Sequence, residues 1–424
     1  MASAVPNSQI DMLATLLKMG FKTGDTKHLE GYAEQLATAA ASLKARQASH
    51  FVFEPTARER SRLRERAAYL RTLPQAEQCT PEWFAYRRGA PGEDGIYTGG
   101  RLTASDTGTV LGMNEYACPE EIIVKKAGRS TFNWSPACEH GKKYENVTLA
   151  IFERREGKCV HEYGCIDGAD GITAASPDGI TVSGDAVEIK NPSGRRVTGV
   201  PKPAYYAQIQ QQLQVLDLEL CHFVETEIRE YDDRTAYRND CPHGETDAPW
   251  TAAGNEKGVL LEIVDAPPAD APAKTPPSFH YVYAPLGIRP SEVGAWLDSE
   301  LDRLGDLPDS RSVLVKFWHL DVYCNTPILR DRVWWAQKLP ELHDFWRRVE
   351  EARRDPAALA HAMTVYEEFR EAKEVRFGRV RKPTRDGRHG RTLQLELGDG
   401  AAVAAVAEPE GACLDNLFGP DTDM

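Results

Sequence analysis

Long apolar runs are missing from this sequence of 424 residues, and so is the apolar core of a signal peptide. A helix that crosses a bilayer needs about 20 predominantly apolar residues. The opening stretch, MASAVPNSQIDMLATLLKMGF, is interrupted by Asn, Gln and Asp, which is not typical of a secretion signal. We therefore expect an intracellular protein that neither spans nor anchors to a membrane.

Cysteines are few and scattered. The nine cysteines are an odd number, which favours reduced thiols over a disulfide framework. The spacings Cys138-x-His140 and Cys159-x-His161-x3-Cys165 match no common zinc finger, so we expect buried thiols at these positions. No set of four suitably spaced cysteines is present that would hold an iron–sulfur cluster.

An excess of positive charge is also missing, since the formal net charge is −13. This balance argues against a nonspecific polycation. It does not exclude an enzyme that acts on nucleic acid, because metal-binding carboxylates add negative charge and a local basic groove is enough to bind phosphates. The composition, 41% hydrophobic and 27% charged, is ordinary for a globular protein.

Composition divides the chain into three parts. We expect a helical N-terminal extension over residues 1–75, a mixed α/β domain over residues 76–375, and a disordered tail, basic and then acidic, over residues 376–424. Within the central domain, residues 232–278 are polar and rich in proline around one strand-like run, GVLLEIV. We interpret that segment as an insertion or long loop.

One short stretch, SPDGITVSGDAVEIKNP, combines a turn with two strand-like runs. Asp178 lies in the Ser-Pro-Asp-Gly corner, which has strong turn chemistry. Glu188 and Lys190 are two residues apart on the second strand, so their side chains share one face. The hairpin therefore brings two carboxylates and an ammonium group together. The alternative interpretation is a surface hairpin with a scattered ion pair.

Two predicted helices carry polar side chains beside apolar stripes. Glu145 lies at the margin of an apolar arc in EHGKKYENVTLAIFERREG, where a partly desolvated carboxylate needs a partner. In YYAQIQQQLQVLDL, Gln208 shares one stripe with Tyr205 and Gln212, next to an apolar stripe that includes Ile209. The alternatives are a glutamate at a helix edge and a solvated glutamine face.

Taken together, these motifs resemble the YqaJ-like viral recombinase family, to which phage lambda exonuclease belongs, within the PD-(D/E)XK nuclease superfamily. The resemblance covers roughly residues 75–230, and other phrases of the chain resemble the versions carried by large DNA viruses. It implies a restriction-endonuclease-like α/β core, a mixed twisted sheet flanked by helices, with helical additions at both ends. The motifs that carry it are Trp83-x3-Arg87, TAS at 103–105, GKKYE at 141–145, SPDG at 176–179, EIK at 188–190 and YYAQIQ at 205–210.

The resemblance implies a metal-dependent DNA exonuclease that hydrolyses the 5′-ended strand of a duplex. The product would be a 3′ overhang for single-strand-annealing recombination or viral DNA processing. Two Mg²⁺ ions, or Mn²⁺ in their place, would be held by Asp178, Glu188 and the carbonyl of Ile189, with Glu145 at the second ion. Lys190 would orient or deprotonate the attacking water.

The remaining roles that the resemblance implies concern positioning and the DNA end. Gln208 would position the water or a phosphate. An arginine and the serine of the TAS element would bind the 5′-terminal phosphate, and Arg87 and Ser105 match them. A basic residue after the active strand also belongs to that pocket, and Arg196 matches it. Because APGEDGIYTGG intervenes where the family has only a few residues, Arg88 and Arg101 are the alternatives to Arg87. Arg195 is the alternative to its neighbour Arg196.

Two other functions are compatible with the same motifs. One is a structure- or site-directed endonuclease on the same core, against which the end-binding residues argue. The other is a DNA-binding module without catalysis, against which the intact acidic and lysine positions argue. The expected substrate is duplex DNA with free ends. A single-strand-annealing protein is a candidate partner, a homo-oligomer is a candidate assembly, and a viral chain would act in the host cytoplasm or nucleus.

Overall fold

The structure is a computed structural model. It divides into two units, Met1–Glu59 and Arg60–Met424. In the first unit the backbone N–H and the hydroxyl of Thr56 both donate to the Glu59 carboxylate at 2.7 Å, at the start of helix α3 (Ala57–Thr72). Most of the predicted N-terminal extension, and the predicted tail except Arg376, lie outside the described residues. The described residues are 53–376 without 94, 130–134, 268–274, 306, 307 and 309.

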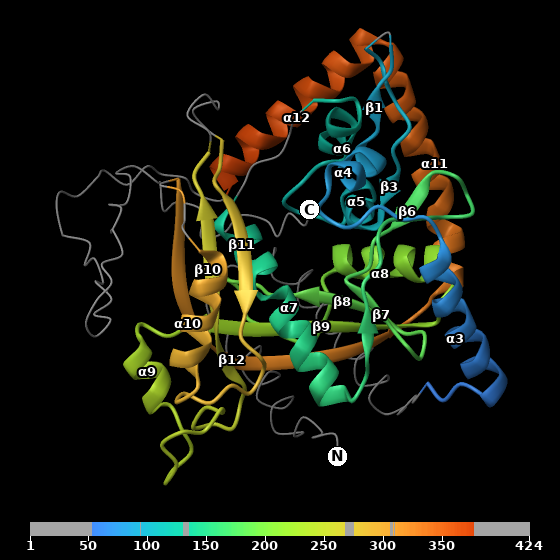
Figure 1. The fold of residues 1–424 in the computed structure, drawn as a ribbon. Helices are drawn as coiled ribbons and strands as arrows, with labels where there is room; N and C mark the ends of the chain where they lie inside the picture. Colours follow the sequence, from blue (N-terminus) through green and yellow to red (C-terminus); the bar gives the residue numbers. More distant parts are fainter. Residues whose placement is uncertain are drawn as a thin grey trace, which may run out of the picture. The chain divides into compact units, whose positions relative to one another are not determined.

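A seven-stranded mixed sheet is the centre of the second unit (Figure 1). Its order is β11-β10-β12-β9-β8-β7-β4, and β8 runs parallel to β9 and antiparallel to β7. All five residues of β8 are buried, as expected for an interior strand. The strands are β4 (Val160–His161), β7 (Gly179–Thr181), β8 (Ala186–Lys190), β9 (Leu220–Glu230), β10 (Lys257–Asp265), β11 (Ser278–Tyr283) and β12 (Arg311–Leu329).

Two helices pack against β8, the strand that carries the EIK motif. Helix α7 (Pro136–Glu156) begins where the Ser135 hydroxyl accepts from the N–H of Cys138, and its Phe152 packs on the apolar side of β8 and β9. Helix α8 (Pro203–Leu216) has proline in its first turn, where the missing N–H costs nothing. In both helices the apolar stripe that the sequence predicts is buried.

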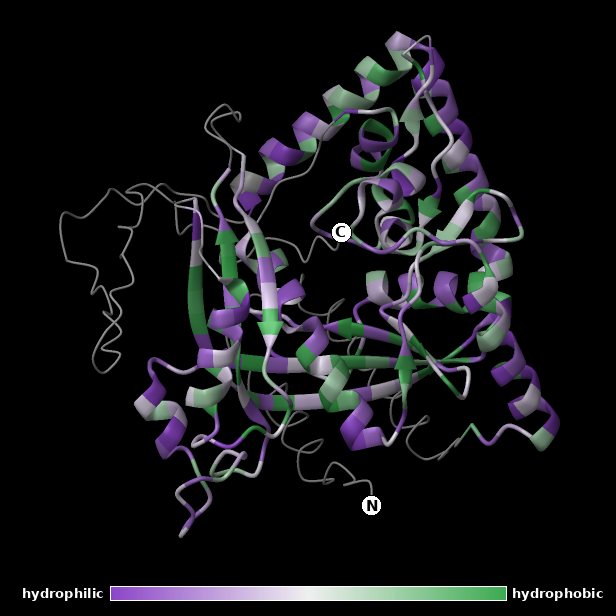
Figure 2. Cartoon of the chain, in the orientation of Figure 1, coloured by the Kyte–Doolittle hydropathy of each residue, from purple (hydrophilic) through white to green (hydrophobic). Residues whose placement is uncertain are grey.

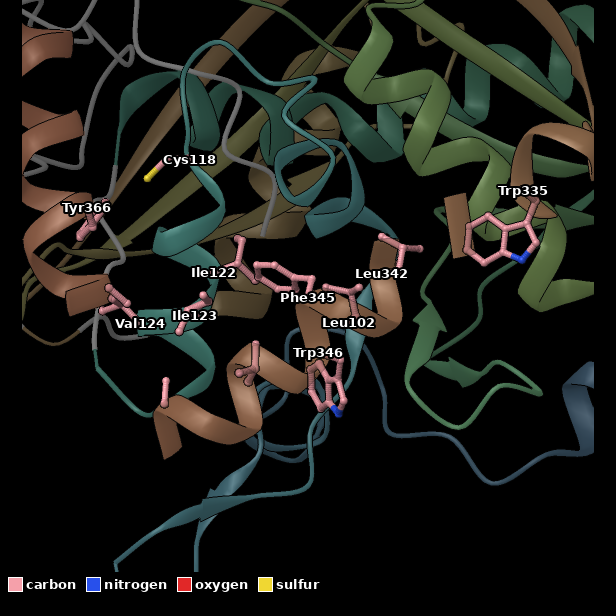
Figure 3. Packing of buried hydrophobic residues seen from close by; sticks show 13 residues of the cluster. Leu102, Cys118, Ile122, Ile123, Val124, Trp335, Leu342, Phe345, Trp346 and Tyr366 are labelled. Carbon is pink, nitrogen blue, oxygen red and sulfur yellow. The ribbon is translucent and has the colours of Figure 1, made fainter. Parts of the chain in front are cut away.

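Helices and short strands form a second layer next to α8 (Figure 1). Its core is a cluster of apolar side chains from α6, α11 and α12, including Ile123, Phe345 and Trp346 (Figure 3). Hydrophobic residues gather on the strands, whereas the outer faces of α3 and α11 are hydrophilic (Figure 2). The elements are α4 (Pro81–Arg88), β1 (Ala90–Pro91), β2 (Tyr97–Thr98), β3 (Leu102–Thr103), α5 (Ala104–Val110), α6 (Pro119–Lys126), β5 (Ile166–Asp167), β6 (Thr173–Ala175), α11 (Arg332–Arg354) and α12 (Pro356–Arg376).

The predicted fold class is confirmed: the chain is α/β, with a mixed sheet flanked by helices. The segment 232–278 includes the strand-like run GVLLEIV as part of a strand. It contains helix α9 (Arg234–Asn239) and strand β10, which pairs with both β11 and β12 inside the sheet. A largely apolar run such as GVLLEIV, interrupted only by the buried Glu262, is typical of a strand buried on both faces. Helix α10 (Val293–Leu304) follows β11, and no helix in the described ranges is long and apolar enough to cross a membrane.

Candidate active site

Glu188 is the most enclosed member of the predicted site, with 1% of its surface exposed. Its Oε1 lies 2.7 Å from the Nζ of Lys190 and accepts from the Nε2 of Gln208 at 2.6 Å. Its Oε2 accepts from the Nε2 of Gln212 at 2.6 Å. Strand alternation turns Glu188 and Lys190 toward α8, and these bonds offset the cost of burying the carboxylate.

Gln212 was missed as a site residue. It lies one helical turn after Gln208 on the same stripe, so the signal was present in the sequence, but a run of glutamines also fits a solvated face. In the structure Gln212 is fully buried. Its Oε1 is a buried acceptor that receives no hydrogen bond from the described protein groups. An acceptor of this kind is normally satisfied by a water or ligand.

Asp178 faces Glu188 from the turn before β7. Its Oδ2 accepts from the N–H of Ile189 at 2.6 Å, which ties the corner to the active strand. Burial raises the pKa of Asp178 well above its usual value, and the negative charges of Glu188 and Glu145 raise it further, against the effect of Lys190. The negative charge of Asp178, Glu188 and Glu145 together is therefore only partly neutralised by Lys190.

Glu145 reaches this group from α7, and α7 is fastened to β8 and β9 by one buried amide. The Oδ1 of Asn191 accepts from the hydroxyls of Thr148 at 2.6 Å and Thr226 at 2.5 Å. Its Nδ2 donates to the carbonyl of Gly141 at 3.2 Å. The residue after Lys190 thus fixes the helix that supplies the third carboxylate.

The donor set fits a hard divalent cation. Within the described ranges no three acidic, histidine or cysteine side chains form a closed metal cage. Mg²⁺ does not require one, since it commonly uses one or two carboxylates and completes its shell with waters and substrate phosphates. A cation held by Asp178 and Glu188 would also relieve the repulsion that raises the pKa of Asp178.

A second polar cluster, formed by Arg87, Ser105 and Thr103, connects to the same corner. The guanidinium of Arg87 lies 3.9 Å from the centre of the Trp83 ring and donates to the Ser105 hydroxyl at 3.0 Å. The Nη2 of Arg87, which donates to Ser105, also lies 3.4 Å from the Thr103 hydroxyl. The indole N–H of Trp83 donates to Ser176 at 3.2 Å, two residues before Asp178.

Lys126 is a supporting residue that sequence reasoning missed. Its Nζ donates to the carbonyls of Arg87 at 2.8 Å and Arg101 at 2.6 Å, and it pairs with Asp106 at 2.9 Å. Burial lowers the pKa of Lys126 to about 8, against the opposing effect of Asp106. These partners are far apart in sequence, so no local pattern marks them.

For the other predicted arginines, the structure records no hydrogen bond to Ser105 among the described residues. Arg101 forms a double hydrogen bond with Asp167 at 2.8 and 2.9 Å. Arg195 pairs with the buried Glu225 at 2.5 Å, and Arg196 is exposed on the loop after β8. Of the candidates for the end-binding role, the structure brings Arg87 and Ser105 together.

A mixed sheet whose buried strand presents Glu188 and Lys190 to a helix that carries Gln208 defines an α/β protein with an acidic polar centre. Residues 82–219 match the YqaJ-like viral recombinase domain. The resemblance that the motifs indicate is therefore confirmed over these residues.

The chain is also similar to known proteins over longer stretches. It is 29% identical over 304 residues to the uncharacterized protein R354 of Acanthamoeba polyphaga mimivirus, covering 65% of this chain and 53% of that relative. The chain thus spans about half the length of this curated relative. An alkaline exonuclease from Laribacter hongkongensis is 19% identical, with coverage of 70% of this chain and 100% of the other and a TM-score of 0.34. A phage-related exonuclease from Haemophilus somnus is 9% identical, with coverage of 43% and 84% and a TM-score of 0.27.

Proposed function

We propose that this protein is a metal-dependent deoxyribonuclease that digests the 5′-ended strand of duplex DNA and leaves a 3′ overhang. The observation that carries the proposal is that Glu188 contacts both Lys190, at 2.7 Å, and Gln208, at 2.6 Å. Asp178 is hydrogen-bonded to the same strand through the N–H of Ile189. Single-strand-annealing recombination or viral DNA processing would use the overhang, with a single-strand-annealing protein as the proposed partner. A homo-oligomer is the proposed assembly.

The chain's own residues would divide the work of hydrolysis. When bound, two Mg²⁺ or Mn²⁺ ions supply Lewis-acid stabilisation of the scissile phosphate, and Asp178, Glu188 and the Ile189 carbonyl would hold the first. Glu145 would hold the second. The Nζ of Lys190, 2.7 Å from Glu188, would orient the attacking water and offset negative charge as it develops on the phosphate.

Gln208 would keep Glu188 in place, since its amide already donates to that carboxylate at 2.6 Å. The cluster of Arg87 and Ser105, with Arg196 on the loop after β8, would bind the 5′-terminal phosphate. A terminal monoester carries more charge than an internal diester and forms stronger charge-assisted bonds with guanidinium. End binding would make the enzyme an exonuclease.

Three DNA substrates test this function. A linear duplex with 5′-phosphate ends, the same duplex with 5′-hydroxyl ends and a covalently closed circle are each incubated with the protein and Mg²⁺. We expect the phosphorylated duplex to be shortened fastest and the circle to stay intact. Nicking of the circle at the rate of linear digestion would establish the endonuclease. Binding without cleavage of any substrate would establish the silent DNA-binding module.

A further inference from the structure

A row of cations and aromatic rings extends from the candidate active site to the C-terminal helix. The Nζ of Lys190 lies 5.2 Å from the centre of the Tyr205 ring, and the Nζ of Lys202 lies 5.8 Å from the same centre. Lys202 also lies 5.4 Å from the Tyr116 ring, and Lys373 of α12 lies 5.9 Å from it. We call Tyr205, Lys202, Tyr116 and Lys373 the lysine–tyrosine strip.

The strip is built on fixed backbone. Helices α5 and α8 approach so closely that a Cβ on Gly108 would lie 2.6 Å from the Cα of Ala204. The N–H of Tyr116 donates to the Asn114 side chain at 3.0 Å. The carbonyl of Tyr116 accepts from Lys373 at 2.9 Å, which connects this loop to α12. The two rings are therefore held by α5, α8 and α12 together.

Lys202 contacts two aromatic rings but no acidic group of the described residues. It is the N-cap residue of α8, yet its side chain makes no capping hydrogen bond. It is half-buried, and no carboxylate among the described residues lies within ion-pair distance of it. A cation that is partly removed from water without an ionic partner is costly. An anion beside Lys202 would remove that cost.

Other charges on the strip make an anion still more favourable. The ammonium groups of Lys202 and Lys373 share the Tyr116 ring, so their positive charges repel each other. Glu115, the residue before that ring, lies 3.7 Å from Arg376 on α12. At the other end, Lys190 is paired with Glu188, and Lys373 attracts the Glu121 carboxylate, so Lys202 is the cation of the strip that has no nearby acid in the described part of the chain.

We propose that the lysine–tyrosine strip binds backbone phosphates of the substrate DNA next to the scissile bond. This inference rests on the proposed function and adds a DNA-binding path through the C-terminal helix. Ammonium groups bind phosphates as point charges, and a series of them that begins at Lys190 suits a strand whose phosphates recur along its length. Contacts of this kind are independent of base sequence and sensitive to salt.

Binding of a fluorescent 30-base-pair duplex, measured with Ca²⁺ in place of Mg²⁺ between 50 and 300 mM KCl, tests the strip. Lys202→Ala should weaken binding roughly three- to tenfold at 100 mM KCl. It should also lower the slope of log K against log[salt] by about 0.9, the value for one lost phosphate contact. Lys202→Arg should restore the slope. Lys338→Ala, which removes a lysine paired with Glu341 on α11, should leave it unchanged.

The outcomes separate this proposal from the proposed function. If the wild type digests DNA while Lys202→Ala keeps the wild-type salt slope, the strip does not bind phosphates and the nuclease assignment stands. A lower melting temperature in Lys202→Ala with an unchanged slope would make the strip a clamp for α12 and overturn the proposal equally. If the wild type neither binds nor digests DNA, the proposed function fails and this inference falls with it.

Discussion

At the scale of single residues, the geometry of Glu188 depends on two glutamines rather than one. Gln208 and Gln212 each donate to a different oxygen of the carboxylate at 2.6 Å. Only Gln208 was predicted, because the family motif ends near it and the later glutamines fit a solvated face equally well. The second donor matters because it leaves no direction in which the buried carboxylate can rotate without losing a hydrogen bond.

Replacing Gln212 with Leu should therefore destabilise the protein and slow DNA cleavage. It removes a hydrogen bond to a buried charged group, which costs about 1.5–3 kcal/mol, and it frees Glu188 to move. Chemical denaturation and single-turnover cleavage measure the two effects. Gln337→Leu, on the exposed face of α11, is the matched control and should change neither. Wild-type stability in the Gln212 variant would show that its bond to Glu188 contributes nothing.

The charge of Asp178 should make the metal-free protein less stable as pH rises. Its folded-state pKa is raised above the unfolded value by burial and by Glu188 and Glu145. Between the two values the folded protein binds more protons than the unfolded chain, so the free energy of unfolding falls as pH increases through that window.

Asp178→Asn removes this titration. In the presence of a chelator, the melting temperature of the variant should exceed that of the wild type at pH 8, and the difference should shrink toward pH 4. Asp298→Asn, at an exposed position of α10, should follow the wild type at every pH. Superimposable wild-type and Asp178→Asn curves would mean that the pKa of Asp178 is not raised in the folded state.

At the scale of elements, helix α4 connects the two polar clusters. Trp83 bonds to Ser176 in the corner before Asp178, and Arg87, one turn later, bonds to Ser105 at the start of α5. A shift of α4 would therefore disturb both clusters. The proposed end-binding pocket is thus coupled to the proposed metal site through a single eight-residue helix.

Arg87→Ala should slow digestion of a 5′-phosphorylated duplex far more than digestion of a 5′-hydroxyl duplex. Loss of a charge-assisted bond of about 1.5–3 kcal/mol corresponds to roughly ten- to a hundredfold in rate. The neighbouring Arg88, which is exposed on the same helix, provides the comparison: Arg88→Ala should slow both substrates little and equally. Equal slowing of both ends by Arg87→Ala would exclude a terminal-phosphate pocket at this position.

At the scale of the whole molecule, local sequence patterns predicted the central hairpin of the candidate site. They did not predict which strands pair across long stretches of sequence. The turn at Asp178 and the alternation at Glu188 and Lys190 follow from neighbouring residues, so the hairpin could be read directly. Strand β10 was visible as the strand-like run GVLLEIV, but the polar, proline-rich segments around it gave no indication of its partners in the sheet. Its burial depends on β12, which forms a hydrogen-bonded register with it from some 50 residues away.

The pairing of Arg101 with Asp167 shows the same limit at the candidate site. Arg101 was an alternative to Arg87 for the end-binding role, but only the fold reveals that its guanidinium is held by Asp167. The support of Lys126 for the Arg87 and Arg101 backbones is equally nonlocal. Motif order therefore predicts the centre of the site better than its surroundings.

The central claim is that Asp178 and Glu188 hold catalytic metal. The most direct test compares the wild type, Asp178→Asn and Glu188→Gln on a 5′-phosphorylated duplex, first with a chelator and then with excess Mg²⁺. We predict that the wild type is silent until Mg²⁺ is added, and that each variant loses cleavage by about a thousandfold, a barrier increase near 4 kcal/mol, while still binding DNA. Wild-type cleavage in the chelator, or full activity in either variant with Mg²⁺, would contradict this assignment.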